Sequence, residues 1–155
     1  MSKVSVGNKV PQFKLPATGD QTIKLSDFKG KNVVLYFYPK DSTPGCTLEG
    51  QGFRDNIRKF RARNTVVLGV SRDSLKSHEN FKTKQKFPFE LISDCDEELC
   101  DLFDVIKDKN MYGKKVRGIE RSTFLINEKG ILAKEWRKVK VEGHVNEVLE
   151  AIKNL

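Results

Sequence analysis

One cysteine lies in a sequence context that favours nucleophilic chemistry. Cys46 follows Thr43, Pro44 and Gly45 in a short segment that comes after an apolar run, and this run predicts a buried strand. Threonine favours the N-cap of a helix and proline its first position, so Cys46 is predicted at the third helical position. Unpaired N–H groups and the helix dipole stabilise anions there, which favours the reactive thiolate. An isolated cysteine is more often a small buried apolar residue, but this context favours function.

The strands that must position this loop follow from hydrophobic periodicity. Four apolar runs predict strands, and the first two are typical of strands buried on both faces. A fifth run is expected to pair antiparallel with the fourth across a turn at Asn127–Gly130. The five runs are Asn32–Tyr38, Thr65–Val70, Phe89–Ile92, Thr123–Ile126 and Ile131–Trp136.

Helices are predicted between and after these strands. One is expected to carry the stripe Phe53, Ile57 and Phe60, and Ser74–Gln85 shows a weaker helical pattern. Asp94 and Glu97 form a capping-box-like start for another helix, and an amphipathic stripe closes the chain. Their apolar positions are Leu99, Leu102, Phe103 and Ile106 in the first, and Val145, Val148, Leu149 and Ile152 in the second. The alternation indicates one α/β domain over residues 1–155.

Composition limits the function classes. The chain of 155 residues has a net charge of +8, with lysines spread along it and no tight basic run, which disfavours nucleic-acid binding as the main role. The basic surface could still steer acidic protein partners. No run approaches the ~18–20 apolar residues that span a bilayer, and no signal peptide is apparent. A cytoplasmic, membrane-free protein with reduced or catalytic thiols is therefore expected.

The cysteine motif resembles that of a known family. Pro39-x-x-x-Thr43-x-x-Cys46 is similar to the peroxidatic motif of peroxiredoxins, and Tyr36–Thr47 resembles the bacterioferritin comigratory protein, or peroxiredoxin Q, branch. This resemblance implies a thioredoxin-like fold with a central mixed sheet flanked by helices and a peroxiredoxin-type elaboration. It extends over essentially the whole chain, through Gly69–Asp73, Phe103–Lys107, Met111–Lys114 and Gly118–Ile126.

The resemblance also implies a thiol-dependent peroxidase. The Cys46 thiolate would attack hydrogen peroxide or an organic hydroperoxide and become a sulfenic acid, without metal, haem or flavin. Thr43 could donate to the thiolate or accept from the peroxide. Arg121 would hold the thiolate and bind the leaving oxygen; the alternative is a surface arginine, which its apolar flanks disfavour. Pro39 would shape the loop and shield the pocket, although it could simply end a strand.

The thiol that would resolve the sulfenic acid is missing from both usual places of this branch. Gln51 and Lys82 occupy them, which leaves Cys95 and Cys100. Cys100 is expected to be a core thiol, whereas Cys95 should be exposed at a helix start and is the better internal candidate. A one-cysteine cycle, in which thioredoxin, glutathione or glutaredoxin attacks Cys46, is favoured over both.

Other readings of the sequence are weaker. A thioredoxin-like reductase needs Cys-x-x-Cys, and Glu49 occupies the second position; a cysteine hydrolase needs a histidine base, and His78 and His144 are expected in or near surface helices. A zinc site lacks ligand spacing, and a binding module would rest on charge alone. Gly50 and Gly52 indicate either a helical turn that can melt or close packing. A monomer is expected.

Overall fold

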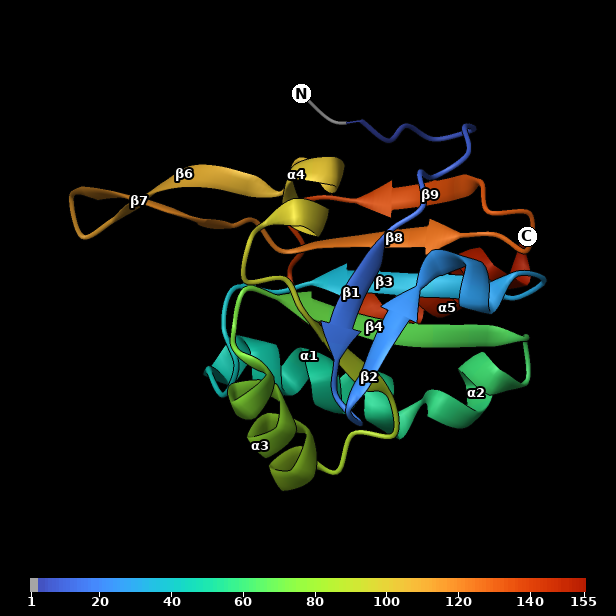
Figure 1. Cartoon of the computed structure of the whole chain (residues 1–155), viewed down its shortest axis with the longest axis horizontal. Helices are drawn as coiled ribbons and strands as arrows, with labels where there is room; N and C mark the ends of the chain where they lie inside the picture. Colours follow the sequence, from blue (N-terminus) through green and yellow to red (C-terminus); the bar gives the residue numbers. More distant parts are fainter. Residues whose placement is uncertain (1–2) are drawn as a thin grey trace.

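A mixed seven-stranded sheet with helices on both faces forms the body of the protein (Figure 1). The computed structural model describes residues 3–155, apart from the side chain of Met111. The strands are β1 (Lys14–Ala17), β2 (Gln21–Lys24), β3 (Asn32–Phe37), β4 (Thr65–Ser71), β5 (Glu90–Ser93), β6 (Ile106–Met111), β7 (Lys114–Ile119), β8 (Ser122–Ile126) and β9 (Leu132–Trp136). The helices are η1 (Leu25–Phe28), α1 (Pro44–Asp55), α2 (Ile57–Arg61), α3 (Leu75–Gln85), α4 (Glu98–Phe103) and α5 (His144–Lys153).

The strand order in the main sheet is β2-β1-β5-β4-β3-β8-β9. Strands β3, β4 and β5 are parallel, as strands joined by crossover helices must be, while β8 pairs antiparallel with β3 and β9 antiparallel with β8. This arrangement confirms the predicted α/β fold with a mixed central sheet and the predicted β8–β9 hairpin.

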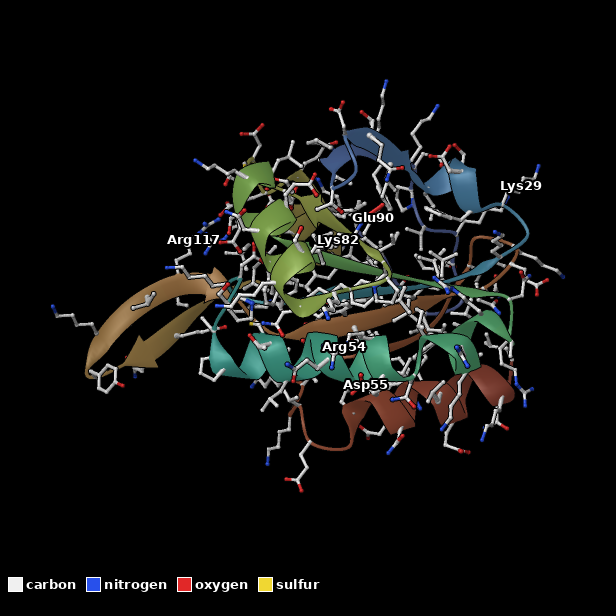
Figure 2. All side chains as sticks on the ribbon, turned by 90° about the horizontal axis from the view of Figure 1, so that it is seen from below. Lys29, Arg54, Asp55, Lys82, Glu90 and Arg117 are labelled. Carbon is white, nitrogen blue, oxygen red and sulfur yellow. The ribbon has the colours of Figure 1, made fainter. Side chains whose placement is uncertain are left out.

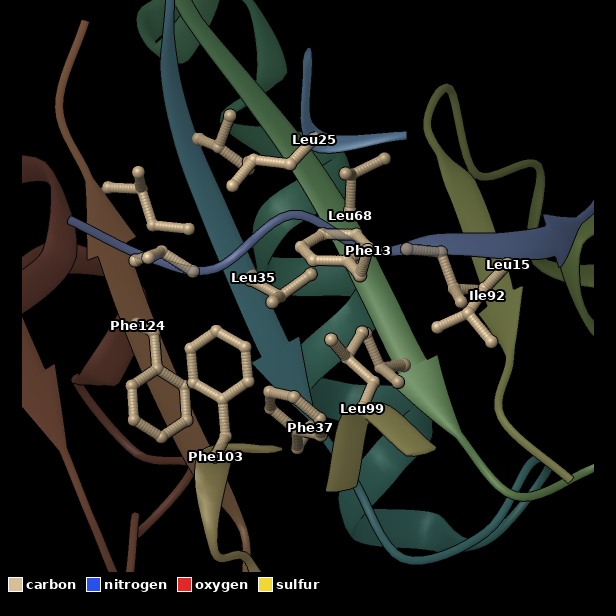
Figure 3. Packing of buried hydrophobic residues seen from close by; sticks show 14 of the residues in the cluster. Phe13, Leu15, Leu25, Leu35, Phe37, Leu68, Ile92, Leu99, Phe103 and Phe124 are labelled. Atoms are coloured by element: carbon tan, nitrogen blue, oxygen red, sulfur yellow. The ribbon is translucent and has the colours of Figure 1, made fainter. Parts of the chain in front are cut away.

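Alternate residues of β3 face two different cores, because successive side chains of a strand point to opposite faces. Leu35 and Phe37 pack with Phe103 of α4 and Phe124 of β8 on one face (Figure 3). Tyr36 faces the other core, which α1, α2, α3 and α5 cover. The continuous apolar run of β3 is thus explained by burial on both sides.

The predicted helix with the Phe53–Phe60 stripe is two helices. Helix α1 ends at Asp55 and α2 begins at Ile57. At the break, the Asn56 side chain donates to the Gly52 carbonyl at 2.8 Å and so competes with helical hydrogen bonding. Phe53 and Phe60 are both buried, so the apolar stripe predicts burial correctly and continuity wrongly.

The predicted capping box at Asp94 is also wrong. The backbone of Glu97 adopts the left-handed conformation, with φ 62°, and α4 begins only at Glu98. The Asp94 carboxylate instead accepts from the N–H groups of Leu99 and Cys100 at 3.0 and 2.7 Å, and so caps the helix from outside. The helix ends at Phe103, and Ile106, predicted on the same helix, begins β6.

Four strands have no counterpart among the predicted elements. Strands β1 and β2 extend the main sheet, and β6 and β7 form a separate two-stranded sheet. The last two are rich in lysine and lack alternation between apolar and polar residues, so periodicity carries no strand signal there. Within residues 3–155, no helix is long and apolar enough to cross a bilayer.

Close packing accounts for Gly50 and Gly52 in α1. A Cβ at Gly50 would lie 2.3 Å from Cζ of Phe87, and one at Gly52 would lie 2.9 Å from Cγ2 of Val145. Both distances are shorter than real Cβ contacts. Of the two explanations open from sequence, the structure supports close approach of the helix to its neighbours.

Gly50→Ala tests that explanation through the sign of its effect. We expect the free energy of unfolding in urea to fall by about 1–3 kcal/mol, because Phe87 or the helix must shift. If Gly50 served only to loosen the helix, alanine would raise stability by about 0.5–1 kcal/mol. In a Phe87→Ala background the same substitution should cost less, and an equal cost would contradict the packing argument.

Candidate active site

The loop after β3 brings Cys46 to a helix N-terminus, as predicted. Thr43 is the N-cap of α1 with extended backbone (φ −81°, ψ 154°), and Pro44 is the first helical residue. The Thr43 hydroxyl does not cap the helix but donates to the Lys40 carbonyl at 2.8 Å. Its hydrogen is therefore engaged, and of the two predicted roles the geometry favours acceptance of a hydrogen bond from a ligand.

Arg121 meets Cys46 across the edge of the sheet. Its guanidinium Nη2 donates to Sγ of Cys46 at 3.4 Å, although the two residues are 75 positions apart. A Cβ on Gly45 would lie 3.1 Å from this nitrogen, so the missing side chain eases the approach of the guanidinium. The donor and the fixed positive charge stabilise a thiolate at this position.

Glu49 completes the cluster and was assigned no site role in the sequence analysis. Its Oε1 accepts from Nη1 of Arg121 at 2.6 Å, and the side chain is fully buried. Burial raises the pKa of Glu49 to about 7, although Arg121 opposes that shift. A signal was present in the sequence, since an acidic residue three positions after Cys46 lies on the same helix face.

Tyr36 lies at the buried side of this cluster. Burial, followed by the charges of Glu49 and Cys46, raises the pKa of Tyr36 well above its usual value, so the phenol is a neutral donor. Among the described residues, Oη of Tyr36 and Oε2 of Glu49 have no hydrogen-bond partner. Both atoms are therefore buried polar groups without a partner in the protein.

A buried hydrogen-bond network fixes the loop that precedes α1. Asp41 accepts from Oη of Tyr38 at 2.6 Å and from Oγ of Ser77 at 2.8 Å, and it lies 2.7 Å from Nδ1 of His78. Its own N–H donates to Asp73 at 2.9 Å. Asp41, Asp73 and His78 are close enough to share a metal ion, but these bonds already engage both Asp41 oxygens, Nδ1 of His78 and one Asp73 oxygen.

Both histidines lie on outer helices, as predicted, but their side chains point into the interior. His78 is fully buried on α3, and His144 is 1% exposed at the start of α5. The second ring nitrogen of His78 faces the Ile92 carbonyl at 2.9 Å, and Nε2 of His144 lies 2.8 Å from Oγ1 of Thr123. Neither imidazole contacts Cys46, so a cysteine–histidine pair for hydrolysis does not form.

The remaining predicted site residues are Pro39, in the loop before α1, and Cys95. Pro39 is half-buried in the bend after β3, which agrees with both roles considered for it. Cys95 is exposed, as expected, but it precedes α4 by three residues rather than starting the helix. Its Sγ lies 3.3 Å from Oγ of Ser93 and 3.7 Å from the Asp73 carbonyl oxygen, and no contact joins it to Cys46 among the described residues.

Cys100 is a core thiol, as predicted. Its side chain is fully buried on α4, in the core on the opposite face of the sheet from Cys46. Burial raises the pKa of Cys100, and the nearby Asp94 carboxylate adds to the shift. All three cysteines are free thiols.

The model of the AhpC/TSA family matches residues 6–135. Peroxiredoxin Bcp of Bacillus subtilis is 50% identical over 152 residues, covering 98% of this chain and 97% of that protein. Peroxiredoxin Bcp of Xanthomonas campestris is 56% identical over 144 residues, with 91% and 89% of the two chains covered.

Solved structures of related proteins share the whole architecture. A cysteine-to-serine variant of Xylella fastidiosa PrxQ superposes with a TM-score of 0.93 at 47% identity, over 99% of this chain and 98% of that one. Peroxiredoxin Q of Xanthomonas campestris gives a TM-score of 0.87 at 54% identity, over 92% and 90%. The thioredoxin-like fold is therefore confirmed.

The raised pKa of Glu49 predicts a pH-dependent stability. Its folded value is about 7 against an ordinary 4.5, so stability is greatest when the carboxyl is protonated and falls as pH rises through 7. Between pH 5.5 and 8 we expect this group to remove about 2 kcal/mol. Urea unfolding across this range gives the free energy of unfolding of Cys46→Ser and of Cys46→Ser/Glu49→Gln, and the difference between their pH slopes is the contribution of Glu49. Equal pH slopes for the two proteins would contradict the shift.

Proposed function

The chain belongs to the AhpC/TSA family, and its relatives there are the peroxiredoxins Bcp and Q, which are thiol-dependent peroxidases. We propose that Cys46 is the thiolate that attacks the hydroperoxide. The observation that carries this proposal is the contact between Arg121 and Sγ of Cys46 at the start of α1. A helix N-terminus and a guanidinium act on one sulfur there, and both favour the nucleophilic form.

The proposed reaction is an in-line displacement at the terminal peroxide oxygen. A sulfur–oxygen bond forms as the oxygen–oxygen bond breaks, and the thiolate becomes a sulfenic acid. The leaving oxygen departs with the electron pair, takes up a proton and is released as water or an alcohol. Arg121 would stabilise its negative charge, and the Thr43 oxygen would accept the hydrogen bond that orients the substrate.

Glu49 is proposed to position Arg121 rather than to touch the substrate. Its 2.6 Å bond to Nη1 fixes one side of the planar guanidinium, which leaves Nη2 directed at Cys46. The guanidinium can serve both partners at once because its donors form a rigid fork. Hydrogen peroxide and organic hydroperoxides are both proposed substrates, and alkyl peroxide reduction is described for the Xanthomonas campestris protein.

An external thiol is proposed to complete the cycle. Attack on the sulfenic acid would form a mixed disulfide and release water, and a second thiol would then restore Cys46. Cys100 is buried in the core on the opposite face of the sheet, and Sγ of Cys95 contacts Ser93 and Asp73, so neither thiol contacts Cys46 in this conformation. Thioredoxin, glutathione and glutaredoxin are the candidate reductants.

Substitution of Cys46 tests the nucleophile. Cys46→Ser should abolish the rapid loss of one thiol after addition of hydrogen peroxide, because serine is not ionised at neutral pH. Thiol titration and mass spectrometry of the quenched protein measure the loss and its position. Cys95→Ser and Cys100→Ser are the matched controls and should react as the parent does. Peroxide consumption that survived in Cys46→Ser would refute the assignment.

The recycling route has its own test. The double variant Cys95→Ser/Cys100→Ser should keep its peroxide turnover with a thiol reductant within about twofold, since neither side chain contacts Cys46. NADPH-coupled assays with thioredoxin and with glutaredoxin measure that turnover. The alternative cycle predicts a different pattern: loss of turnover in Cys95→Ser with normal first oxidation would make Cys95 the resolving thiol.

A further inference from the structure

The β6–β7 hairpin is the least integrated part of the described structure. It forms its own two-stranded sheet, and no third strand pairs with either edge. In Figure 1 it projects from the end of the body where α4 lies. An isolated hairpin is only marginally stable in water. A long exposed hairpin therefore needs either strong anchoring or a role that requires it to project.

The anchoring is confined to the base of the hairpin. Arg117 forms two bonds of 2.6 Å to the Glu97 carboxylate, and Arg72 adds a third at 2.9 Å. Lys107 pairs with Asp104 at 3.1 Å. The first of these contacts also holds the pKa of Glu97 to about 2, so that carboxylate stays charged.

The hairpin carries half of the net charge of the chain. It has five cationic residues and one carboxylate, a net +4 of the total +8. Lys114 and Lys115, next to the turn, are exposed and make no ion pair among the described residues. Lys107 and Arg117 are already paired with Asp104 and Glu97 at the base, so the positive charge available to a partner is that of Lys114 and Lys115 next to the turn.

Two exposed apolar side chains lie on the same hairpin, and a third lies on α1, close in sequence to Cys46. The turn residues Tyr112 and Gly113 both have positive φ, 53° and 78°, which gives a tight hairpin turn and directs Tyr112 into solvent. Tyr112 is fully exposed, Val116 is 41% exposed and Leu48, two residues after Cys46, is 60% exposed. These are three of the six large exposed hydrophobic residues in residues 3–155. Aromatic side chains are common anchors of protein interfaces.

The base of the hairpin connects directly to the reactive cluster. Strand β7 ends at Ile119, two residues before Arg121. The Lys109 ammonium donates to the Ile119 carbonyl, and Arg121 then reaches Cys46. A protein bound at the base of the hairpin would therefore lie next to the segment that brings Arg121 to Cys46.

From these observations we infer that the β6–β7 hairpin is a docking surface for an acidic protein that carries the reducing thiol. The inference rests on the proposed peroxidase cycle and adds to it the class of partner. Edge lysines also discourage strand pairing between molecules. Protection against such pairing would explain the lysines, but it would not explain a fully exposed tyrosine at the tip or a connection to Arg121.

Charge reversal at the tip tests the docking surface. Lys114→Glu/Lys115→Glu should lower kcat/KM for an acidic thioredoxin about tenfold at low salt, and the loss should shrink to about twofold at 0.5 M salt. Tyr112→Ser should lower the same constant without changing its salt dependence. Turnover with dithiothreitol, a small neutral reductant, should be unchanged in both.

The matched control is Lys29→Glu/Lys31→Glu, which changes the net charge equally. These exposed lysines precede β3, whereas Cys46 follows it, and Figure 2 shows Lys29 at the opposite end of the molecule from Arg117. An equal loss in this control would indicate a net-charge effect and overturn the docking site.

The remaining outcomes separate the two proposals. Unchanged thioredoxin turnover in Lys114→Glu/Lys115→Glu, or a parent protein that dithiothreitol reduces but neither acidic thioredoxin nor acidic glutaredoxin does, overturns the docking site and leaves the peroxidase intact. A parent protein that consumes no peroxide with dithiothreitol refutes the peroxidase itself, and the inferred partner with it.

Discussion

The guanidinium of Arg121 is the interaction on which the site depends. It donates to Cys46 at 3.4 Å and to Glu49 at 2.6 Å, and both partners are almost completely buried. Two potential anions at a buried position would repel each other strongly without a cation between them. The positive charge of Arg121 reduces the repulsion between Cys46 and Glu49. The pKa of Glu49 is nevertheless raised, because the effect of burial is larger than that of Arg121. The ionisation of Glu49 therefore depends on two opposing effects, its burial and the charge of Arg121.

The sheet delivers these residues to one place. In the antiparallel β3–β8 pair, Phe37 lies opposite Ser122, so the segment entering β8 and the loop leaving β3 meet at the same edge. Arg121 precedes Ser122 directly, and α1 begins seven residues after Phe37. The two cores on either face fix both strands, because every residue of β3 is buried. Packing far from the sulfur thus sets the sulfur–guanidinium distance.

Sequence reasoning reached the parts of this arrangement that local chemistry encodes. Thr43 and Pro44 specify the start of α1, and the β-branched run specifies β3. The approach of Arg121 to Cys46 came from the family resemblance, because no local rule pairs residues so far apart. Glu49 was missed because its role exists only through Arg121. The burial of His78 and His144 was missed because it depends on polar partners, Asp41 and Thr123, supplied by distant segments. The β6–β7 hairpin was missed because most of its residues are polar and no alternation of apolar and polar residues marks its strands.

The two proposed steps require different exposure of Cys46: it is buried for the reaction with peroxide, but a reducing protein must be able to reach it. Its side chain is 2% exposed, which suits a small peroxide and keeps the charges around it in a low dielectric. A protein thiol cannot reach a sulfur buried to that degree. Gly50 and Gly52 pack too closely on Phe87 and Val145 for the middle of α1 to move easily. We therefore expect opening at the first turn, where the Thr43 hydroxyl bonds to the Lys40 carbonyl and end groups fray most readily. A partner held on the β6–β7 hairpin would stay bound while the opening is brief, so recycling would not need a permanently exposed sulfur.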